Sequence, residues 1–226
     1  IDSDDWIHEN YIEILYKNLH EKKADISICN FLEIADEEDP IINISNKLRI
    51  FNNIEALHEL YGALYIQFVI SCAKLFKKYL FEELRFPNGK VHEDEFTSYK
   101  LLYNAKKIVF INDQLYYYYQ SKNSITRSGF KLKNKLDVLE AYEEQALYFE
   151  KNHNKEFSLK AYKRLFEIYN SIKENLHLIK DEQEKILFSK NYKKFIIQFK
   201  KLKFGKKYTI YYKSYLFSPF LAKTIK

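Results

Sequence analysis

The stretch KKIVFINDQLYYYYQS, residues 106–121, decides the fold class, because β-branched and aromatic residues dominate it. It predicts two short strands, KKIVFIND at residues 106–113 and QLYYYYQS at residues 114–121. The stretch ADISICNFL, residues 24–32, alternates in polarity and predicts another, buried strand. Helical patterns lie between these strands, so this part of the chain is predicted to be of the α/β class.

Helices are expected where apolar residues recur every three or four positions. The first helix is expected to start after Asp4 or Asp5, whose short carboxylates suit an N-cap, and to end at Lys22 or Lys23. Further helices are expected at residues 52–62, 74–84 and 93–105, and a loop at residues 85–94, which contain Pro87 and Gly89.

From residue 129 onward the pattern is helical throughout. We therefore divide the chain near Ser128 into residues 1–128, part of a mixed-sheet domain, and residues 129–226, a mostly helical region with a basic aromatic tail. Two apolar stripes are expected to form the helical core, namely Leu139, Tyr142, Ala146 and Phe149, and Leu165, Ile168, Tyr169, Ile172 and Leu176.

The composition excludes several protein classes. Gly 4 and Pro 3 argue against a turn-rich β fold, and the apolar runs are far shorter than the roughly 18 residues of a membrane-spanning helix. Cys29 and Cys72 lie in apolar surroundings without metal-finger spacing, as expected of small buried residues in a reducing compartment. Met is absent even at position 1, so we expect the natural N-terminus to lie upstream and the chain alone to be inactive.

The net charge of +6 hides an asymmetry along the chain. The segment Lys190–Lys226 carries Lys among Phe, Tyr, Ile and Leu and has no acidic residue. A basic amphipathic segment suits an anionic membrane surface, which makes that surface one expected partner. The alternatives are a solvated helix face packed on the body, and a nucleic-acid-binding tail, against which the absence of Arg from the segment argues.

The chain opens on IDSDDWI, with three aspartates within four positions. Asp2 and Asp4, two carboxylates separated by one residue in a turn, can point into one cleft and share a hard divalent cation with a diphosphate. The competing interpretation is a helix N-cap with spare surface acids, which the stretch taken alone favours.

Two further stretches offer polar side chains for chemistry. In FPNGKVHEDE, residues 86–95, Glu93 and Asp94 follow a loop and open a helix, where a carboxylate can act as a general base or simply favour the helix dipole. In QLYYYYQSKNSIT, residues 114–126, Ser124 and Lys122 are candidates for a phosphate contact.

Together these stretches resemble the second half of a family 2 inverting glycosyltransferase with the GT-A fold, of the bacterial surface-polysaccharide type. The resemblance implies that Asp2-Ser3-Asp4 is the metal- and donor-binding DxD motif, holding Mg²⁺ or Mn²⁺ and a nucleotide-sugar diphosphate. It also implies that Asp94 is the catalytic base, with Glu93 beside it, and that the nucleotide-binding segment lies upstream. The resemblance is carried by residues 2–19, 24–31, 72–95 and 114–126.

The resemblance implies transfer of a sugar from a nucleotide-diphosphate donor to a glycan or lipid-linked hydroxyl, with inversion. The basic tail adds the expectation of a cytoplasmic protein attached peripherally to the inner face of the cell membrane. His92 and Lys74 are weaker candidates for substrate contact, because a loop position and a packed aliphatic stem explain them as well. The rival hypotheses are a nucleic-acid-binding protein, a non-catalytic glycosyltransferase-like scaffold, and an aspartate phosphatase, whose DxDx[TV] pattern fails here at Trp6.

Overall fold

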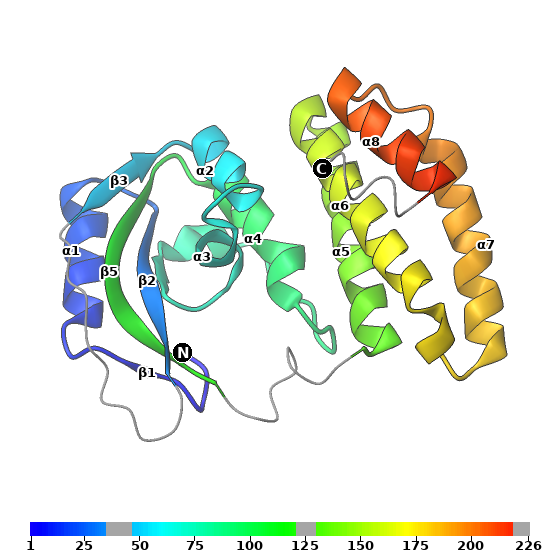
Figure 1. The fold of residues 1–226 in the computed structure, drawn as a ribbon. Coiled ribbons are helices and arrows are strands. Elements are labelled where there is room, and N and C mark those ends of the chain that lie inside the picture. The colour runs from blue at the N-terminus through cyan, green and yellow to red at the C-terminus, as the bar shows by residue number, and fades with distance from the viewer. Residues whose placement is uncertain (35–46, 121–129, 219–226) are drawn as a thin grey trace.

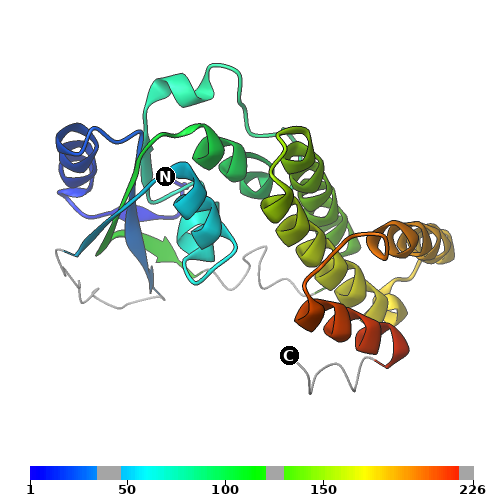
Figure 2. The ribbon, with the colours of Figure 1, turned by 90° about the horizontal axis from the view of Figure 1, so that it is seen from above.

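The computed structural model describes residues 1–34, 47–120 and 130–218. A mixed sheet with helices on both faces forms one part, and a group of helices forms the other (Figures 1 and 2). The α/β class predicted from the sequence is confirmed.

The sheet is built around a parallel pair, β2 (Ile26–Ile34) and β5 (Ile108–Tyr119). Their side chains are mostly buried, as expected of strands covered on both faces. Three short strands pair antiparallel with this pair and give the order β1-β5-β2-β4 with β3 also on β5. These are β1 (Trp6–Ile7), β3 (Leu48–Phe51) and β4 (Lys74–Phe76).

The prediction of two strands in residues 106–121 is wrong, because β5 is continuous. The predicted break nevertheless marks an irregularity: Cys29 pairs with Ile111, but Asn30 pairs with Gln114. A second shift follows at once, because Phe31 pairs with Tyr116. Asn112, Asp113 and Leu115 are therefore extra residues on β5, the arrangement of a β-bulge.

Helices cover both faces of the sheet. Helix α1 (Tyr11–Glu21) packs on one face through Tyr11 and Leu15. The opposite face carries α2 (Asn53–Leu60), α3 (Tyr65–Val69) and α4 (Glu93–Asn104), as Figure 1 shows. The predicted helices at residues 52–62 and 93–105 are confirmed, and Asn52 caps α2 by accepting a bond from the Glu55 N–H.

Two helix predictions are wrong. The Asp5 carboxylate does not cap a helix, because it accepts bonds from the Tyr116 hydroxyl (2.6 Å) and the Tyr119 N–H (2.9 Å) of β5. That anchor lays residues 6–7 along β5 as β1, and α1 starts only after Asn10. Residues 74–84 form β4 and the short 3₁₀ turn η1 (Lys78–Phe81), because β4 pairs with the edge of β2.

The helical part consists of long helices whose apolar stripes face one another. The buried aromatic residues include Phe166 and Phe199, whose rings stack at 4.8 Å. All four residues of the predicted stripe on α5 are buried. The elements are α5 (Leu132–Lys151), α6 (Lys155–Glu174), η3 (Leu176–Leu178), α7 (Glu182–Phe199) and α8 (Lys206–Phe217).

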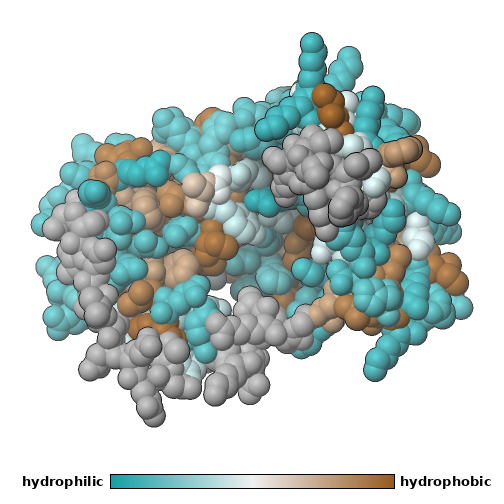
Figure 3. Space-filling model, in the orientation of Figure 1, coloured by the Kyte–Doolittle hydropathy of each residue, from teal (hydrophilic) through white to brown (hydrophobic). Residues whose placement is uncertain are grey.

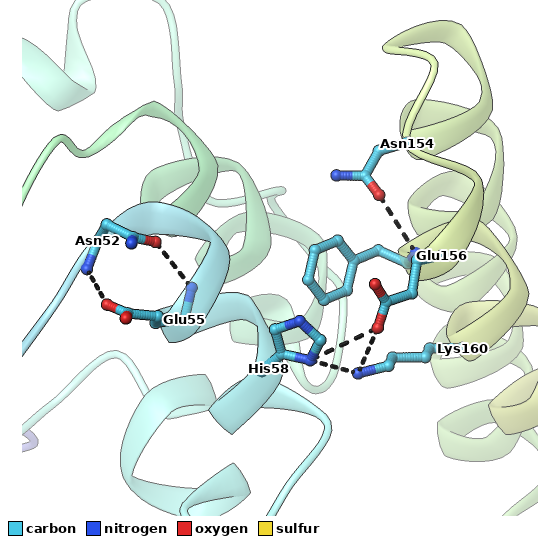
Figure 4. Close-up of polar contacts among 7 residues, drawn as sticks. Asn52, Glu55, His58, Asn154, Glu156 and Lys160 are labelled. Atoms are coloured by element: carbon cyan, nitrogen blue, oxygen red, sulfur yellow. Dashed lines mark hydrogen bonds and ion pairs between the residues drawn. The ribbon is translucent and has the colours of Figure 1, made fainter.

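The two parts share core and polar contacts. Phe149 of α5 and Phe157 of α6 are buried in the same cluster as the sheet residues Ile26 and Ile108. Figure 4 shows His58 of α2, which approaches the Lys160 ammonium of α6 at 2.8 Å. The division at residue 128, which lies outside the described residues, stays a prediction.

Candidate functional site

A cavity of about 450 Å³ lies between the start of the chain, at Asp2, and the acidic residues Glu93 and Asp94. It is walled by the start of the chain, the ends of β2 and β5, the segment that follows α3, and the first turn of α4. Its lining residues are Asp2, Phe31, Glu33, Tyr65, Ile66, Val69, Ile70, Ser71, Cys72, His92, Glu93, Asp94, Glu95, Tyr118 and Gln120.

Three of the main candidates from the sequence line this cavity together, namely Asp2, Glu93 and Asp94, and so does the weaker candidate His92. Asp2 keeps much of its surface exposed, but partial burial raises its pKa, and the negative charges of Asp5, Asp4 and Glu93 add to the rise. Asp4 is exposed in the neighbouring turn and is not among the lining residues. Ser124 and Lys122 lie outside the described residues.

Asp94 is half-buried in the first turn of α4, and its Oδ1 accepts a bond from the Glu95 N–H at 2.9 Å. Burial raises the pKa of Asp94 above its usual value, and the charge of Glu93 raises it further. The Glu95 N–H, His92 and Lys74 act in the opposite direction. A carboxylate whose pKa is raised, and which still borders a cavity, is suited to accept a proton from a bound hydroxyl.

His92 lines the same cavity and adopts a left-handed conformation, with φ 59° and ψ 47°. This backbone turn starts α4 abruptly and presents Glu93 and Asp94 at the helix N-terminus, where the helix dipole favours negative charge.

Lys74 stands behind the wall of the cavity and is not among its lining residues. Its ammonium donates to the carbonyls of Ile70 and Cys72, two residues that do line the cavity. Burial lowers the pKa of Lys74 to about 8, although nearby Asp94 favours its charged form. In this structure the Lys74 ammonium therefore stabilises the main chain of the cavity wall and does not face the cavity.

The sequence did not single out several lining residues. Glu33 and Tyr65 belong to a strand and a helix whose patterns carry no functional signal, and α3 itself was not predicted. Glu95 stood beside the proposed base in the acidic run Glu93–Glu95, but nothing in that run shows that it alone is fully buried.

The residues of the cavity suit a cation that binds together with a phosphate-containing ligand better than a metal ion held by protein side chains alone. Within residues 1–34, 47–120 and 130–218, no three or more His, Cys, Asp or Glu side chains are grouped to hold a metal. Mg²⁺ commonly uses one or two protein carboxylates and takes its other ligands from water and phosphate. Burial is the main cause of the raised pKa of Asp2, and the neighbouring negative charges that add to it are of the kind that a bound cation relieves.

The sequence of this chain is similar to two curated glycosyltransferases. The chain is 37% identical over 150 residues to glycosyltransferase GlyG of Streptococcus pneumoniae serotype 4, matching 63% of this chain and 50% of GlyG. It is 33% identical over 134 residues to glycosyltransferase GlyA of the same organism, matching 56% of this chain and 19% of GlyA. The chain thus spans half of GlyG and about a fifth of GlyA. No family model matches the sequence.

Among solved structures the fold is that of Staphylococcus aureus TarS. Residues 1–349 of TarS in complex with UDP-GlcNAc match with a TM-score of 0.60 and 18% identity, covering 82% of this chain and 53% of that one. Another structure of TarS 1–349 matches with a TM-score of 0.56 and 17% identity, covering 88% of this chain and 54% of that one. At 17–18% identity the likeness to TarS establishes the fold alone. The similarity to glycosyltransferases rests on the sequence relatives GlyA and GlyG.

Proposed function

We propose that this chain, a relative of the glycosyltransferases GlyA and GlyG, is part of the catalytic domain of an inverting GT-A glycosyltransferase of family 2. The observation that carries the proposal is that Asp2 and Asp94, far apart in sequence, line one cavity. The intact protein would transfer a sugar from a nucleotide-diphosphate donor to a hydroxyl of a glycan or lipid-linked acceptor, in bacterial surface-polysaccharide synthesis. The structural neighbour TarS, solved with UDP-GlcNAc and with UDP, supports a UDP-sugar donor.

The residues of the cavity suit a single displacement. Asp94 accepts the proton of the acceptor hydroxyl while that oxygen bonds to the anomeric carbon of the donor sugar. The bond from the anomeric carbon to the diphosphate oxygen breaks, and the nucleotide diphosphate leaves with the electron pair. Attack opposite the leaving group inverts the anomeric centre. Burial and, after it, the charge of Glu93 keep Asp94 basic, because both raise the pKa of that carboxyl.

Asp2 and Asp4 would hold Mg²⁺ or Mn²⁺ together with the donor diphosphate, and Ser124 would contact a donor phosphate. When bound, such an ion neutralises charge that develops on the leaving diphosphate. Asp2 then orients the donor from the side of the cavity next to β5, to whose Tyr116 hydroxyl its own N–H is bonded at 3.2 Å.

The proposal is tested with a panel of UDP-sugars on the intact protein, including the upstream segment expected from the sequence, by measuring release of UDP. We expect release with at least one sugar, its loss in EDTA, and recovery with Mn²⁺ or Mg²⁺. Asp2→Asn should raise the metal concentration needed for half-maximal rate, whereas Ser71→Ala, a cavity substitution without a carboxylate, should not. Full activity in EDTA would contradict the metal role, and no release with any donor would contradict the transferase.

A second candidate function is attachment to the inner face of the cell membrane through the tail. The structure corrects one part of this hypothesis, the contact of the tail's aromatic residues with the membrane. Phe195, Phe199 and Tyr212 are buried in the helical core and cannot enter a membrane. What favours attachment is α7, where Ile186 and Ile197 are about 60% exposed (60% and 62%) and flank Lys190, Lys193 and Lys194. Figure 3 shows hydrophobic and hydrophilic side chains interspersed over the helical part. Among the described residues no helix is long and apolar enough to cross a membrane.

We expect the chain to bind vesicles that contain phosphatidylglycerol and not vesicles of phosphatidylcholine alone. Each lysine near an anionic surface contributes about 1 kcal/mol, so Lys193→Glu with Lys194→Glu should weaken binding about tenfold or more. Lys17→Glu with Lys151→Glu, an equal charge change on α1 and α5, should leave binding nearly unchanged. Sedimentation with vesicles measures both, and equal effects of the two pairs, or a salt-dependent gel shift with RNA in place of vesicle binding, would contradict membrane attachment.

A further inference from the structure

We propose that Glu95 is a positioning residue, which fixes the first turn of α4 to α3 and α5 and thereby holds the Asp94 carboxylate toward the cavity. The inference rests on the proposed function, because it concerns the group that we assign as the base. Under this inference the helical region contributes to the reaction without contacting the donor, because α5 helps to hold the proposed base in place.

The side chain of Glu95 is only 6% exposed and lies among hydrogen-bond donors from two other helices. Its Oε1 accepts bonds from the hydroxyls of Tyr65 on α3 and of Tyr142 on α5, the latter at 3.3 Å. Its Oε2 lies 3.5 Å from Nε2 of Gln145 on α5. A buried carboxylate is costly unless it is hydrogen-bonded, and these donors meet that requirement.

The backbone of Glu95 is held as well. The Gln145 side chain, itself buried, donates from Nε2 to the Glu95 carbonyl at 2.8 Å. The Tyr61 hydroxyl, at the end of α2, donates to Oε1 of Gln145 at 2.7 Å. The first turn of α4 is therefore attached to its surroundings at both the side chain and the main chain of one residue.

The link to the proposed base is direct, because the N–H of Glu95 donates to Asp94 Oδ1 at 2.9 Å and also to the His92 carbonyl at 3.0 Å. A second attachment precedes the helix, where the Val91 N–H donates to Oδ2 of Asp137 on α5 at 3.1 Å. Helix α5 thus holds the chain on either side of Asp94, and a shift of either attachment would move that carboxylate relative to the cavity.

A purely structural role explains Glu95 less well. Replacing a whole buried ionic group together with its partners by well-packed apolar side chains is often neutral or stabilising, so stability alone does not call for a carboxylate here. Glu95 and Tyr65 also line both the 450 Å³ cavity and a second cavity of about 290 Å³ between α3, α5 and α6. The Tyr65–Glu95 hydrogen bond therefore lies in the wall between the site and the helical region.

The test compares Glu95→Leu, which keeps the approximate volume but removes the acceptor oxygens, with Glu95→Gln, which retains one for the tyrosines. Sugar transfer by the intact protein is measured as kcat and as KM for the UDP-sugar that gives turnover. Small misplacements of catalytic groups cost up to about 100-fold, so we expect kcat of Glu95→Leu to fall about 10- to 100-fold with an almost unchanged donor KM. Glu95→Gln should recover most of that loss, and Tyr148→Phe, a control on α5 outside the network, should behave as wild type.

Thermal unfolding of every variant separates misfolding from misplacement. If Glu95→Leu does not fold, Gln145→Leu and Tyr142→Phe decide, since each removes one attachment and should lower kcat without changing donor KM. Wild-type kcat in a folded Glu95→Leu protein, or equal losses in Glu95→Leu and Glu95→Gln, would overturn the inference. If Asp94→Asn is itself fully active, the proposed function fails; if Asp94→Asn is inactive but Glu95→Leu is not impaired, only the positioning role fails.

Discussion

Asp94→Asn is expected to lower the rate of sugar transfer by about 10²- to 10⁴-fold, the usual contribution of general-base catalysis, while nucleotide-sugar binding survives. The amide keeps the size of the carboxylate, and its oxygen can still accept the bond from the Glu95 N–H. It cannot take up the proton of the acceptor hydroxyl. Transfer is measured as UDP release in the presence of acceptor, and donor affinity by calorimetric titration of the same protein.

The pH dependence follows from the same residue. Asp94 acts as a base only when it is ionised, and burial raises its pKa above the ordinary value of 3.8. Activity should therefore fall as the pH drops through a pKa higher than that of an exposed aspartate. Glu83→Gln, an exposed acid outside the cavity, is the matched control and should retain the wild-type rate and profile. Near-normal turnover by Asp94→Asn would remove this residue from the mechanism.

Phe149→Ala is expected to destabilise the chain by about 3–5 kcal/mol, the usual cost of deleting a fully buried aromatic ring. Phe149 is inaccessible to solvent and contacts the rings of Tyr99 on α4 and Phe157 on α6, so its removal opens a cavity between α5 and these two helices. Urea unfolding measures the change. Leu147→Ala, two residues away and 54% exposed, should alter the free energy of unfolding by no more than about 0.5 kcal/mol.

Phe149 also tests how closely the two parts of the chain are coupled. It belongs to a helix of the C-terminal part but is buried in the cluster that includes Ile108 of β5. We expect Phe149→Ala to shift the unfolding of the sheet and of the helices together. Two transitions, of which the substitution moves only the helical one, would show that the parts are stabilised independently.

The sequence was informative where a local pattern and burial agree. The β-branched stretch at residues 24–32 became β2, and the acidic run opening residues 93–105 became the start of α4. The convergence of Asp2 and Asp94 came from a family resemblance rather than from any local signal, because neither residue carries information about a partner ninety positions away. In the structure Asp2 and Asp94 line one cavity and Asp4 is not among its lining residues, and the roles assigned to all three stay predictions.

The sequence failed where a distant contact outweighed a local preference. Asp5 has the side chain of an N-cap, but the Tyr116 hydroxyl and the Tyr119 N–H compete for its carboxylate and prevail. Residues 74–84 have a helical pattern, but pairing with β2 draws Lys74–Phe76 into the sheet. The sequence did not point to Glu95, because what distinguishes it is its contacts with Tyr65, Tyr142 and Gln145. Only the tertiary structure brings these residues together.

The irregularity in β5 determines which way Tyr116 points. Across it, β5 advances three residues relative to β2, from Ile26 opposite Ile108 to Ile34 opposite Tyr119. Because successive side chains alternate between the faces of a sheet, an odd advance reverses the parity of every later residue. Tyr116 thus joins Val109 on the α1 face, although Phe110, of its own parity, packs on the other. If β5 had no extra residues, the Tyr116 hydroxyl would face away from Asp5. The aspartate-rich start of the chain would then lose one of the hydrogen bonds that hold it beside the cavity.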